Sequence, residues 1–165
     1  MSPILQSLTT AGFTATLGLL LKIYFDERDR KQKSKSLAAA LAGEIGAYLE
    51  LSNARQLPDT YRKMAKSVDA IASRGATPDP PTGHPVFDAV AGDLGLLTTD
   101  LAKRVSEFYN VVSVWRSFMR QLKSPEFNAM PTELRVRIIN NFADLFEPKI
   151  DGFFKLLDDL KRFSD

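Results

Sequence analysis

The sequence predicts an all-α protein in which an N-terminal transmembrane helix continues into an antiparallel helical bundle of about four main helices. Residues 4–21 are uncharged without interruption. Apolar residues in the rest of the chain recur at spacings of three and four, and no segment shows the sustained alternation of a half-buried strand. We expect a transmembrane anchor over residues 1–25, a basic juxtamembrane segment over 26–36 and a helical-bundle domain over 37–165.

The N-terminal segment is long enough to cross a bilayer. As a helix, Pro3 to Phe25 spans about 35 Å, against a hydrocarbon core of about 30 Å. Four threonines and Gln6 make it only moderately hydrophobic. A cleavable signal peptide is one alternative, but it would carry its basic residues before the apolar run rather than after it. A buried helix of a soluble core is the other, and such helices are usually shorter and rarely followed by so dense a basic cluster.

A basic cluster follows the predicted span and indicates its orientation. Its members are Lys22, Arg28, Arg30, Lys31, Lys33 and Lys35. By the positive-inside rule, we expect the N-terminus to lie outside and the C-terminal domain to be cytoplasmic. These side chains would contact phospholipid headgroups or serve only as a topology signal. Nucleic acid is not expected as a partner, because the basic excess lies beside the membrane and not on the folded domain.

Small and hydroxyl-bearing residues recur every four positions in the predicted span. They form two series, Ser7, Ala11 and Ala15, and Thr10, Thr14 and Gly18. Such series let helices approach closely in lipid, so they predict packing against a protein partner or a second copy of the chain. The alternative is an anchor whose threonines hydrogen-bond to their own backbone.

The basic segment leads into an alanine- and leucine-rich stretch without a helix breaker. One helix should therefore run from the membrane to about Gln56, with Pro58 ending it. Asp59 would cap a second helix that stops near Gly75. Its apolar face would carry Tyr61, Met64, Val68 and Ile71.

The second half of the chain contains a proline-rich loop and three further helices. Residues 76–85 hold four prolines, and a short helix should follow from Pro85 to about Leu94. Thr98 or Thr99 would cap a long helix that ends near Lys123. Its core face would be Leu101, Val105, Phe108, Val112, Trp115, Met119 and Leu122.

The last helix should start near Pro131 and be kinked at Pro148. Its apolar stripe would comprise Leu134, Ile138, Phe142, Leu145, Phe146, Ile150, Phe153, Leu157 and Leu160. Phe118, Phe154 and Phe163 lie beside the main stripes. They would form a docking patch if exposed together, although their spacing is equally that of core packing.

The sequence contains no phosphate-binding, dinucleotide-binding or zinc-protease motif. It has no cysteine and a single histidine, His84, which disfavours a thiolate metal site or a nucleophile–base relay. We therefore expect no enzyme activity, no cofactor and no metal. His84 is either a pH-sensing group or an exposed loop residue.

The acidic residues are not expected to form a metal site. Asp158 and Asp159 point about 100° apart on a helix and, with Asp151, fit a solvated face better than a cation site. Glu44 and Glu50 lie on different faces of their helix.

Two segments resemble a pattern in uncharacterised bacterial inner-membrane proteins. They are RKQKSKSLAAALAGEI (Arg30–Ile45) and HPVFDAVAGDLGLLTTDLAKRVSEFYN (His84–Asn110). The resemblance implies a bacterial cytoplasmic-membrane location and a helical domain behind one span. It implies no activity and no functional residues.

These observations favour a single-pass membrane protein that acts by binding, as a scaffold or regulatory subunit. Its expected partners are the lipid bilayer and either another protein or a second copy of the chain that binds through the transmembrane helix. One alternative is an oligomerising membrane effector, a toxin or defence protein that perturbs the bilayer. Another is a lipid-handling or enzymatic domain with a cavity between its helices.

Overall fold

The computed structural model describes residues 3–68 and 83–165, with side chains described from Lys22 onward, and these two ranges contain helices and no strand. The all-α prediction is therefore confirmed. In chain order the elements are α1 (Pro3–Leu51), η1 (Ala54–Gln56), α2 (Leu57–Lys66), α4 (Pro85–Val90), η2 (Ala91–Leu96), α5 (Thr99–Leu122), α6 (Pro125–Asn128), α7 (Thr132–Phe146), η3 (Glu147–Lys149) and α8 (Ile150–Ser164).

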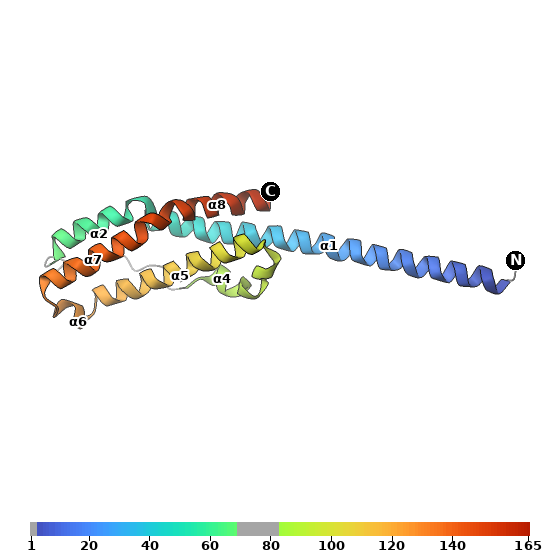
Figure 1. Ribbon diagram of the computed structural model, residues 1–165, viewed down its shortest axis with the longest axis horizontal. Coiled ribbons are helices and arrows are strands. Elements are labelled where there is room, and N and C mark those ends of the chain that lie inside the picture. The colour runs from blue at the N-terminus through green and yellow to red at the C-terminus, as the bar shows by residue number, and fades with distance from the viewer. Residues whose placement is uncertain (1–2, 69–82) are drawn as a thin grey trace.

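Helix α1 is one unbroken helix of 49 residues, about 74 Å long at 1.5 Å per residue. Figure 1 shows its N-terminal part projecting alone and its C-terminal part entering the bundle. Residues 22–33 are exposed, and Ser34 is the first buried residue. We call residues 22–33 the stalk. The predicted long helix is confirmed, and its second half supplies core residues Leu41 and Ile45.

Helix α1 ends earlier than expected and for a different reason. The last residue of the helix is Leu51. Two residues later, Asn53 adopts a left-handed backbone conformation with φ 47°, and the helix cannot continue through it. Pro58 does not end α1; it lies in the first turn of α2, where its missing N–H leaves no hydrogen bond unmade. Asp59 lies in that first turn as well and is not the cap. Helix α2 ends at Lys66, because Ser67 leaves the α conformation with φ −126° and ψ 34°, and so it ends earlier than expected. The predicted end near Gly75 itself lies outside the described residues.

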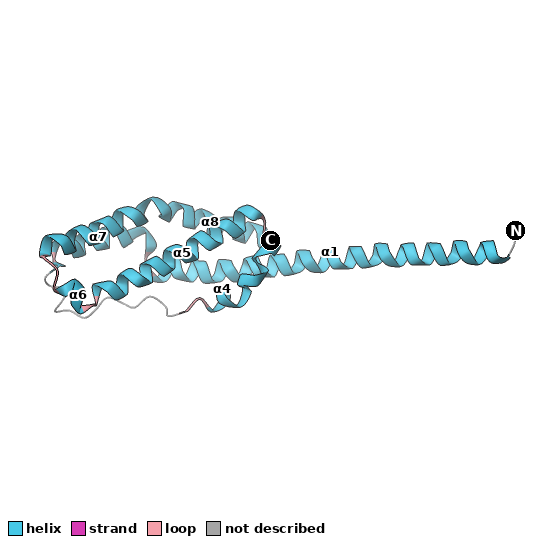
Figure 2. Cartoon of the chain, turned by 60° about the horizontal axis from the view of Figure 1, so that its bottom comes forward, coloured by secondary structure: helices cyan, strands magenta, loops and turns pink. Residues whose placement is uncertain are grey.

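The main helices form three columns. Helix α2 continues beyond the end of α1 instead of folding back along it, and α7 and α8 form a second bent column that returns toward the stalk (Figures 1 and 2). Accordingly, α1 packs mainly on α8 and α2 mainly on α7. Helix α5 is the third column and runs away from the stalk, in the same direction as α1 and α2. The expected up-and-down arrangement of four helices is therefore wrong in its topology.

The α5 prediction is confirmed in detail. Thr98 is the N-cap, and its side-chain oxygen accepts a hydrogen bond from the N–H of Leu101 at 3.3 Å. All seven residues assigned to its core face are buried. Ser124 then caps α6, so the predicted break at Ser124–Pro125 begins a new short helix.

Pro148 interrupts the last helical column, as expected. It lies within the 3-10 turn η3, which separates α7 from α8. Phe142, Phe146, Ile150 and Phe153 are buried on either side of this turn. Leu145, however, is 56% exposed, because the buried face of α7 is centred on Ile139, Phe142 and Phe146, and Leu145 points about 100° away from it.

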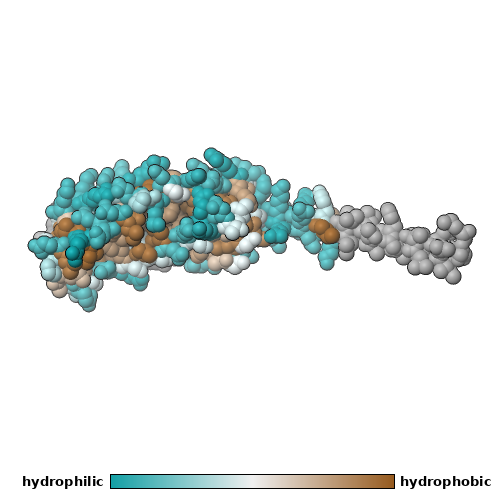
Figure 3. Space-filling view, viewed as in Figure 1, coloured by the Kyte–Doolittle hydropathy of each residue, from teal (hydrophilic) through white to brown (hydrophobic). Residues whose placement is uncertain are grey.

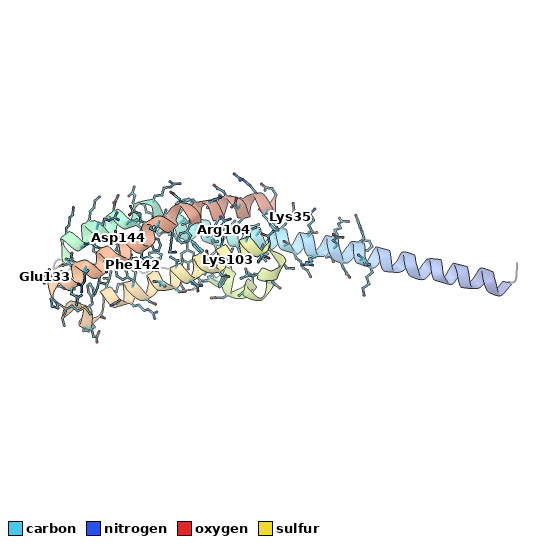
Figure 4. The ribbon with its side chains drawn as sticks, in the orientation of Figure 1. Lys35, Lys103, Arg104, Glu133, Phe142 and Asp144 are labelled. Atoms are coloured by element: carbon cyan, nitrogen blue, oxygen red, sulfur yellow. The ribbon has the colours of Figure 1, made fainter. Side chains whose placement is uncertain are left out.

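The core of the bundle is rich in aromatic rings. Phe118 of α5 stacks on Phe142 of α7 with ring centroids 3.8 Å apart, and Tyr61 of α2 meets Phe142 edge-on at 5.2 Å. Figure 4 shows Phe142 within the bundle. These contacts join all three columns at the end away from the stalk, because each ring comes from a different column.

Within the part of the chain whose side chains are described, no helix combines the length and apolar character needed to cross a bilayer. The predicted anchor lies, from residue 1 to 21, outside that part.

The backbone at Asn53 gives the first testable prediction. A left-handed conformation costs a residue with a Cβ about 1–2 kcal/mol, less for asparagine and nothing for glycine. Asn53→Ala should therefore lower the free energy of unfolding by about 1 kcal/mol relative to Asn53→Gly. Both variants lose the Asn53–Gln56 side-chain hydrogen bond, so the pair isolates the backbone. Equal denaturation midpoints would contradict this account of the helix end.

Candidate functional site: a polar cluster joining three helices

Glu44 of α1 caps the short helix α4 from a distance in sequence. Its two carboxylate oxygens accept the N–H groups of Val86 at 3.0 Å and Phe87 at 3.1 Å. These two N–H groups lie in the first turn of α4, where no intrahelical acceptor exists and a negative charge is favoured. The residue at the N-cap position, His84, makes no side-chain cap. Glu44 thus supplies the N-terminal cap that no side chain next to α4 provides.

Tyr109 of α5 completes the surroundings of Glu44. Its hydroxyl donates a 2.5 Å hydrogen bond to Oε2, the oxygen that also accepts the N–H of Phe87. Burial, and next the bond to the Glu44 carboxylate, raise the pKa of Tyr109 well above its ordinary value of 10.0. The phenol therefore stays protonated and remains a donor. Its ring stacks on Phe87 with centroids 4.0 Å apart.

Arg116 of α5 bonds both to α1 and to residues 83–84, the segment that precedes α4. Its guanidinium contacts the His84 Nε2 at 2.9 Å and donates to the carbonyl oxygen of Gly83 at 2.7 Å. It also donates to the hydroxyl of Tyr48 in α1. The Tyr48 hydroxyl in turn donates to the Gly83 carbonyl at 2.6 Å and lies 3.1 Å from the His84 Nδ1.

The bonding partners define the protonation state of His84. Arg116 offers only donors, so the Nε2 that faces it must be an acceptor. With Nε2 as the acceptor, the neutral tautomer carries its hydrogen on Nδ1. The Nδ1 lies 3.1 Å from the Tyr48 hydroxyl, which can accept because its own proton goes to Gly83, and 3.4 Å from a second guanidinium nitrogen of Arg116. The ring is therefore neutral. Burial first, and then the charge of Arg116, lower the pKa of His84 below 6.5, against the opposing effect of Asp88 and Glu44.

We call Glu44, Tyr48, His84, Tyr109 and Arg116 the polar cluster. Its carboxylate, hydroxyl and terminal guanidinium groups bond to one another and to the backbone of residues 83–87. The Nε of Arg116 is buried without a hydrogen-bond partner. The hydroxyls of Tyr48 and Tyr109 already donate their protons to other groups of the protein, so they are not free to act as nucleophiles. The His84 ring is a poor general base, because the adjacent guanidinium disfavours its protonation. The arrangement suits a structural role: it holds α4 against α1 and α5.

The polar cluster was not predicted, although the spacing of its residues is visible in the sequence. Glu44 and Tyr48 are four residues apart in one helix, and Tyr109 and Arg116 are seven apart in another, so each pair shares a helix face. The expectation that His84 is exposed is wrong: it is 8% exposed, because Tyr48, Tyr109 and Arg116 surround it.

A second buried polar group lies among the aromatic rings. The Trp115 indole N–H donates to the Tyr61 hydroxyl at 2.6 Å, and this hydroxyl contacts the Met119 sulfur at 3.1 Å. Burial raises the pKa of Tyr61 to about 12. This group ties α2 to α5 within the core and is closed to solvent.

Ion pairs on the surface connect neighbouring columns. Arg62 of α2 binds Asp144 at 2.8 Å and Glu147 at 2.6 Å, and this bonding lowers the pKa of Glu147. Arg104 of α5 binds Asp159 of α8 at 2.7 Å and lowers the pKa of its carboxyl. Exposed pairs of this kind contribute little individually.

The acidic residues of α8 do not converge on one point. Asp151 and Asp158 are exposed, and Asp159 is occupied by Arg104. Within residues 22–68 and 83–165, no group of three His, Asp or Glu side chains lies close enough to hold a metal ion.

The predicted docking patch is wrong. Phe118 is buried and stacked on Phe142. Phe154 is partly buried under the guanidinium of Arg55, which lies 4.2 Å from its ring centroid, and Phe163 is partly buried against the core. These three side chains contact neighbouring parts of the bundle and are not exposed together.

The predicted headgroup-contacting residues lie along the stalk. Lys22, Arg28, Arg30, Lys31 and Lys33 are exposed. Lys35 is partly buried at the bundle end of the stalk (Figure 4), and its ammonium donates to the backbone carbonyl of Asp165 at 2.5 Å. The predicted packing face of the span lies outside the described side chains: Ser7, Thr10, Ala11, Thr14, Ala15 and Gly18.

Grooves open between neighbouring helices on the described surface. One of about 430 Å³ lies between α5 and α8 and has Arg104, Lys149 and Phe153 in its walls. Another, of about 680 Å³, lies between α2 and α7, beside Arg62, Lys66 and Asn140. Charged and polar side chains make up half or more of the residues that line each groove.

Comparisons with protein-family models, with curated proteins and with solved structures find no significant match. Any function assigned to the chain therefore rests on its own sequence and structure.

The cap provided by Glu44 gives a second prediction. Glu44→Ala removes three hydrogen bonds to a carboxylate and leaves two N–H groups of α4 without an acceptor. It should lower the free energy of unfolding by about 3 kcal/mol. The matched control is Glu50→Ala on the exposed side of the same helix, which should change it by less than about 0.5 kcal/mol. Chemical denaturation of both variants measures the difference, and similar losses would show that the cap contributes little.

Proposed function

We propose that this protein is a single-pass membrane protein that holds a helical interaction domain close to the bilayer and acts by binding rather than by catalysis. The observation that carries the proposal is the unbroken helix α1, which joins the predicted anchor to the core of the bundle. We infer an N-out, C-in orientation from the basic residues that follow the anchor. A bacterial inner membrane is the location that the resemblance of Arg30–Ile45 and His84–Asn110 implies.

Three exposed apolar residues support the membrane end of this proposal. Ile23, Tyr24 and Phe25 are 54%, 60% and 53% exposed. Because consecutive residues point about 100° apart, these side chains are spread over about 200° of the helix circumference. One partner helix could cover only one side, whereas lipid covers all of them. Figure 3 shows hydrophobic atoms on the stalk, separated from the bundle by hydrophilic ones.

The stalk then carries its basic residues to the depth of the headgroups. Arg28 to Lys33 lie about 5–12 Å beyond Phe25 along the helix axis. The headgroup layer on each side of a bilayer is about 5–8 Å thick. Basic side chains at this level would bind anionic lipids, and the bundle, which begins at Ser34, would lie directly above them.

The stalk is built to remain helical without a partner. Asp26, Glu27 and Asp29 each stand four residues before a basic residue, at Arg30, Lys31 and Lys33. Acid-before-base pairs with this spacing stabilise an isolated helix by about 0.2–0.5 kcal/mol each. No apolar residue lies between Phe25 and Leu37, so the stalk has no coiled-coil seam. Self-association, if the protein oligomerises, would thus involve the span.

Membrane fractionation tests the anchor. The full chain should sediment with membranes and stay there in high salt, while a chain lacking residues 1–25 should be soluble. The matched control replaces Arg28, Arg30 and Lys31 by glutamine: it should also stay in the membrane fraction, because lipid burial of the anchor does not depend on these charges. Release of the full chain by salt, or its recovery in the soluble fraction, would contradict an integral anchor.

Reconstituted vesicles separate the binding proposal from the effector alternative. An anchored binding module should leave a trapped dye inside vesicles of phosphatidylethanolamine and phosphatidylglycerol. Dye release that depends on residues 1–25 would favour an oligomerising effector and overturn the binding proposal.

A further inference from the structure

We propose that His84 is a pH-sensitive switch whose protonation releases the segment Pro85–Leu96 from α1 and α5. The switch depends on the polar cluster and not on the membrane anchor, so the two can fail separately. It gives the single histidine of the chain a role beyond packing.

The contact between His84 and Arg116 cannot survive protonation of the ring. The Nε2 lies 2.9 Å from a guanidinium nitrogen, and the ring is 8% exposed. A protonated ring would place an N–H against an N–H and a positive charge beside another, with little water to screen them. The Nδ1 is already a donor to Tyr48, so no rearrangement of the tautomer relieves the conflict.

Charged and titratable groups face His84 from three helices. Helix α1 presents Glu44 and Tyr48, α5 presents Tyr109 and Arg116, and α4 presents Asp88. The two carboxylates favour a protonated ring, whereas burial and Arg116 disfavour it.

Glu44 cannot neutralise the protonated ring without a cost to α4. Both of its oxygens are held by Val86, Phe87 and Tyr109. If it turns toward His84, the first turn of α4 loses its cap. If it stays, the positive ring must leave its place between Tyr48 and Arg116. In either case the start of α4 separates from α1.

Release of this segment would uncover apolar surface at one place. Val86, Phe87 and Val90 pack against the core, and Phe87 also stacks on Tyr109. Helix α4 lies at the stalk end of the bundle (Figure 1). The uncovered side chains would therefore lie at the end of the domain from which the stalk projects.

The direction of the pH effect is set by the lowered pKa of His84. A group with a pKa lower in the closed state than in the open state binds a proton on opening. The closed state is therefore fully favoured above the ordinary value of 6.5, and this advantage is lost as the pH falls below it.

Hydrogen exchange on the full chain in detergent micelles tests the switch. Protection factors, which correct for the intrinsic pH dependence of exchange, should fall by up to about tenfold at Val86 and Phe87 between pH 7.5 and pH 5.5. Amides in the middle of α5, such as that of Val112, should keep theirs. In His84→Gln, which retains an acceptor facing Arg116 but does not titrate, the protection at Val86 and Phe87 should be independent of pH.

The wild-type ring provides a second readout that needs no variant. Because the chain has one histidine, its imidazole NMR signals are assigned without ambiguity. The ring should be neutral at pH 7.5, with the hydrogen on Nδ1, and should become protonated as the α4 amides lose protection. Protonation with unchanged protection at Val86 and Phe87 would overturn the switch, as would a ring that remains neutral at pH 5.

Discussion

The continuity of helix α1 is the constraint on which the rest of the structure depends. A single helix has one axis and one rotational phase, so each residue of its first half fixes the direction of each residue in its second half. Leu41 and Ile45, both fully buried, belong to the same helix as the exposed stalk. The bundle therefore cannot rotate or tilt relative to the stalk without breaking hydrogen bonds in α1.

The polar cluster extends this constraint to α4 and α5. Glu44 and Tyr48 of α1 hold the start of α4, and Tyr109 and Arg116 bring α5 to the same place. The far end of the bundle is held differently, by stacked rings from α2, α5 and α7. One end thus depends on protonation states and the other on apolar packing. The single histidine lies at the end with the cluster, so we expect pH in the physiological range to act there.

Sequence patterns predict those features that depend on local chemistry. The seven-residue stripe and the Thr98 cap of α5 can be derived from periodicity and from a side chain next to its own helix. The prediction for Pro58 is wrong because proline both ends helices and begins them, and the left-handed Asn53 that actually ends α1 has no unique signal. The direction of α2, the cap from Glu44 and the burial of His84 depend on contacts across more than thirty residues. Spacing could identify their shared faces but not their partners.

The most direct test of the central claim is a distance measured across the stalk in a lipid bilayer. The chain has no cysteine, so spin labels can be attached at Lys22→Cys and Ala40→Cys without other changes. These positions are both exposed and are five helical turns apart, on one face and about 27 Å apart along the axis. A continuous α1 predicts a single narrow distance distribution consistent with that separation. A broad distribution, or a substantially shorter distance, would show that the helix breaks between the anchor and the bundle and would contradict the account.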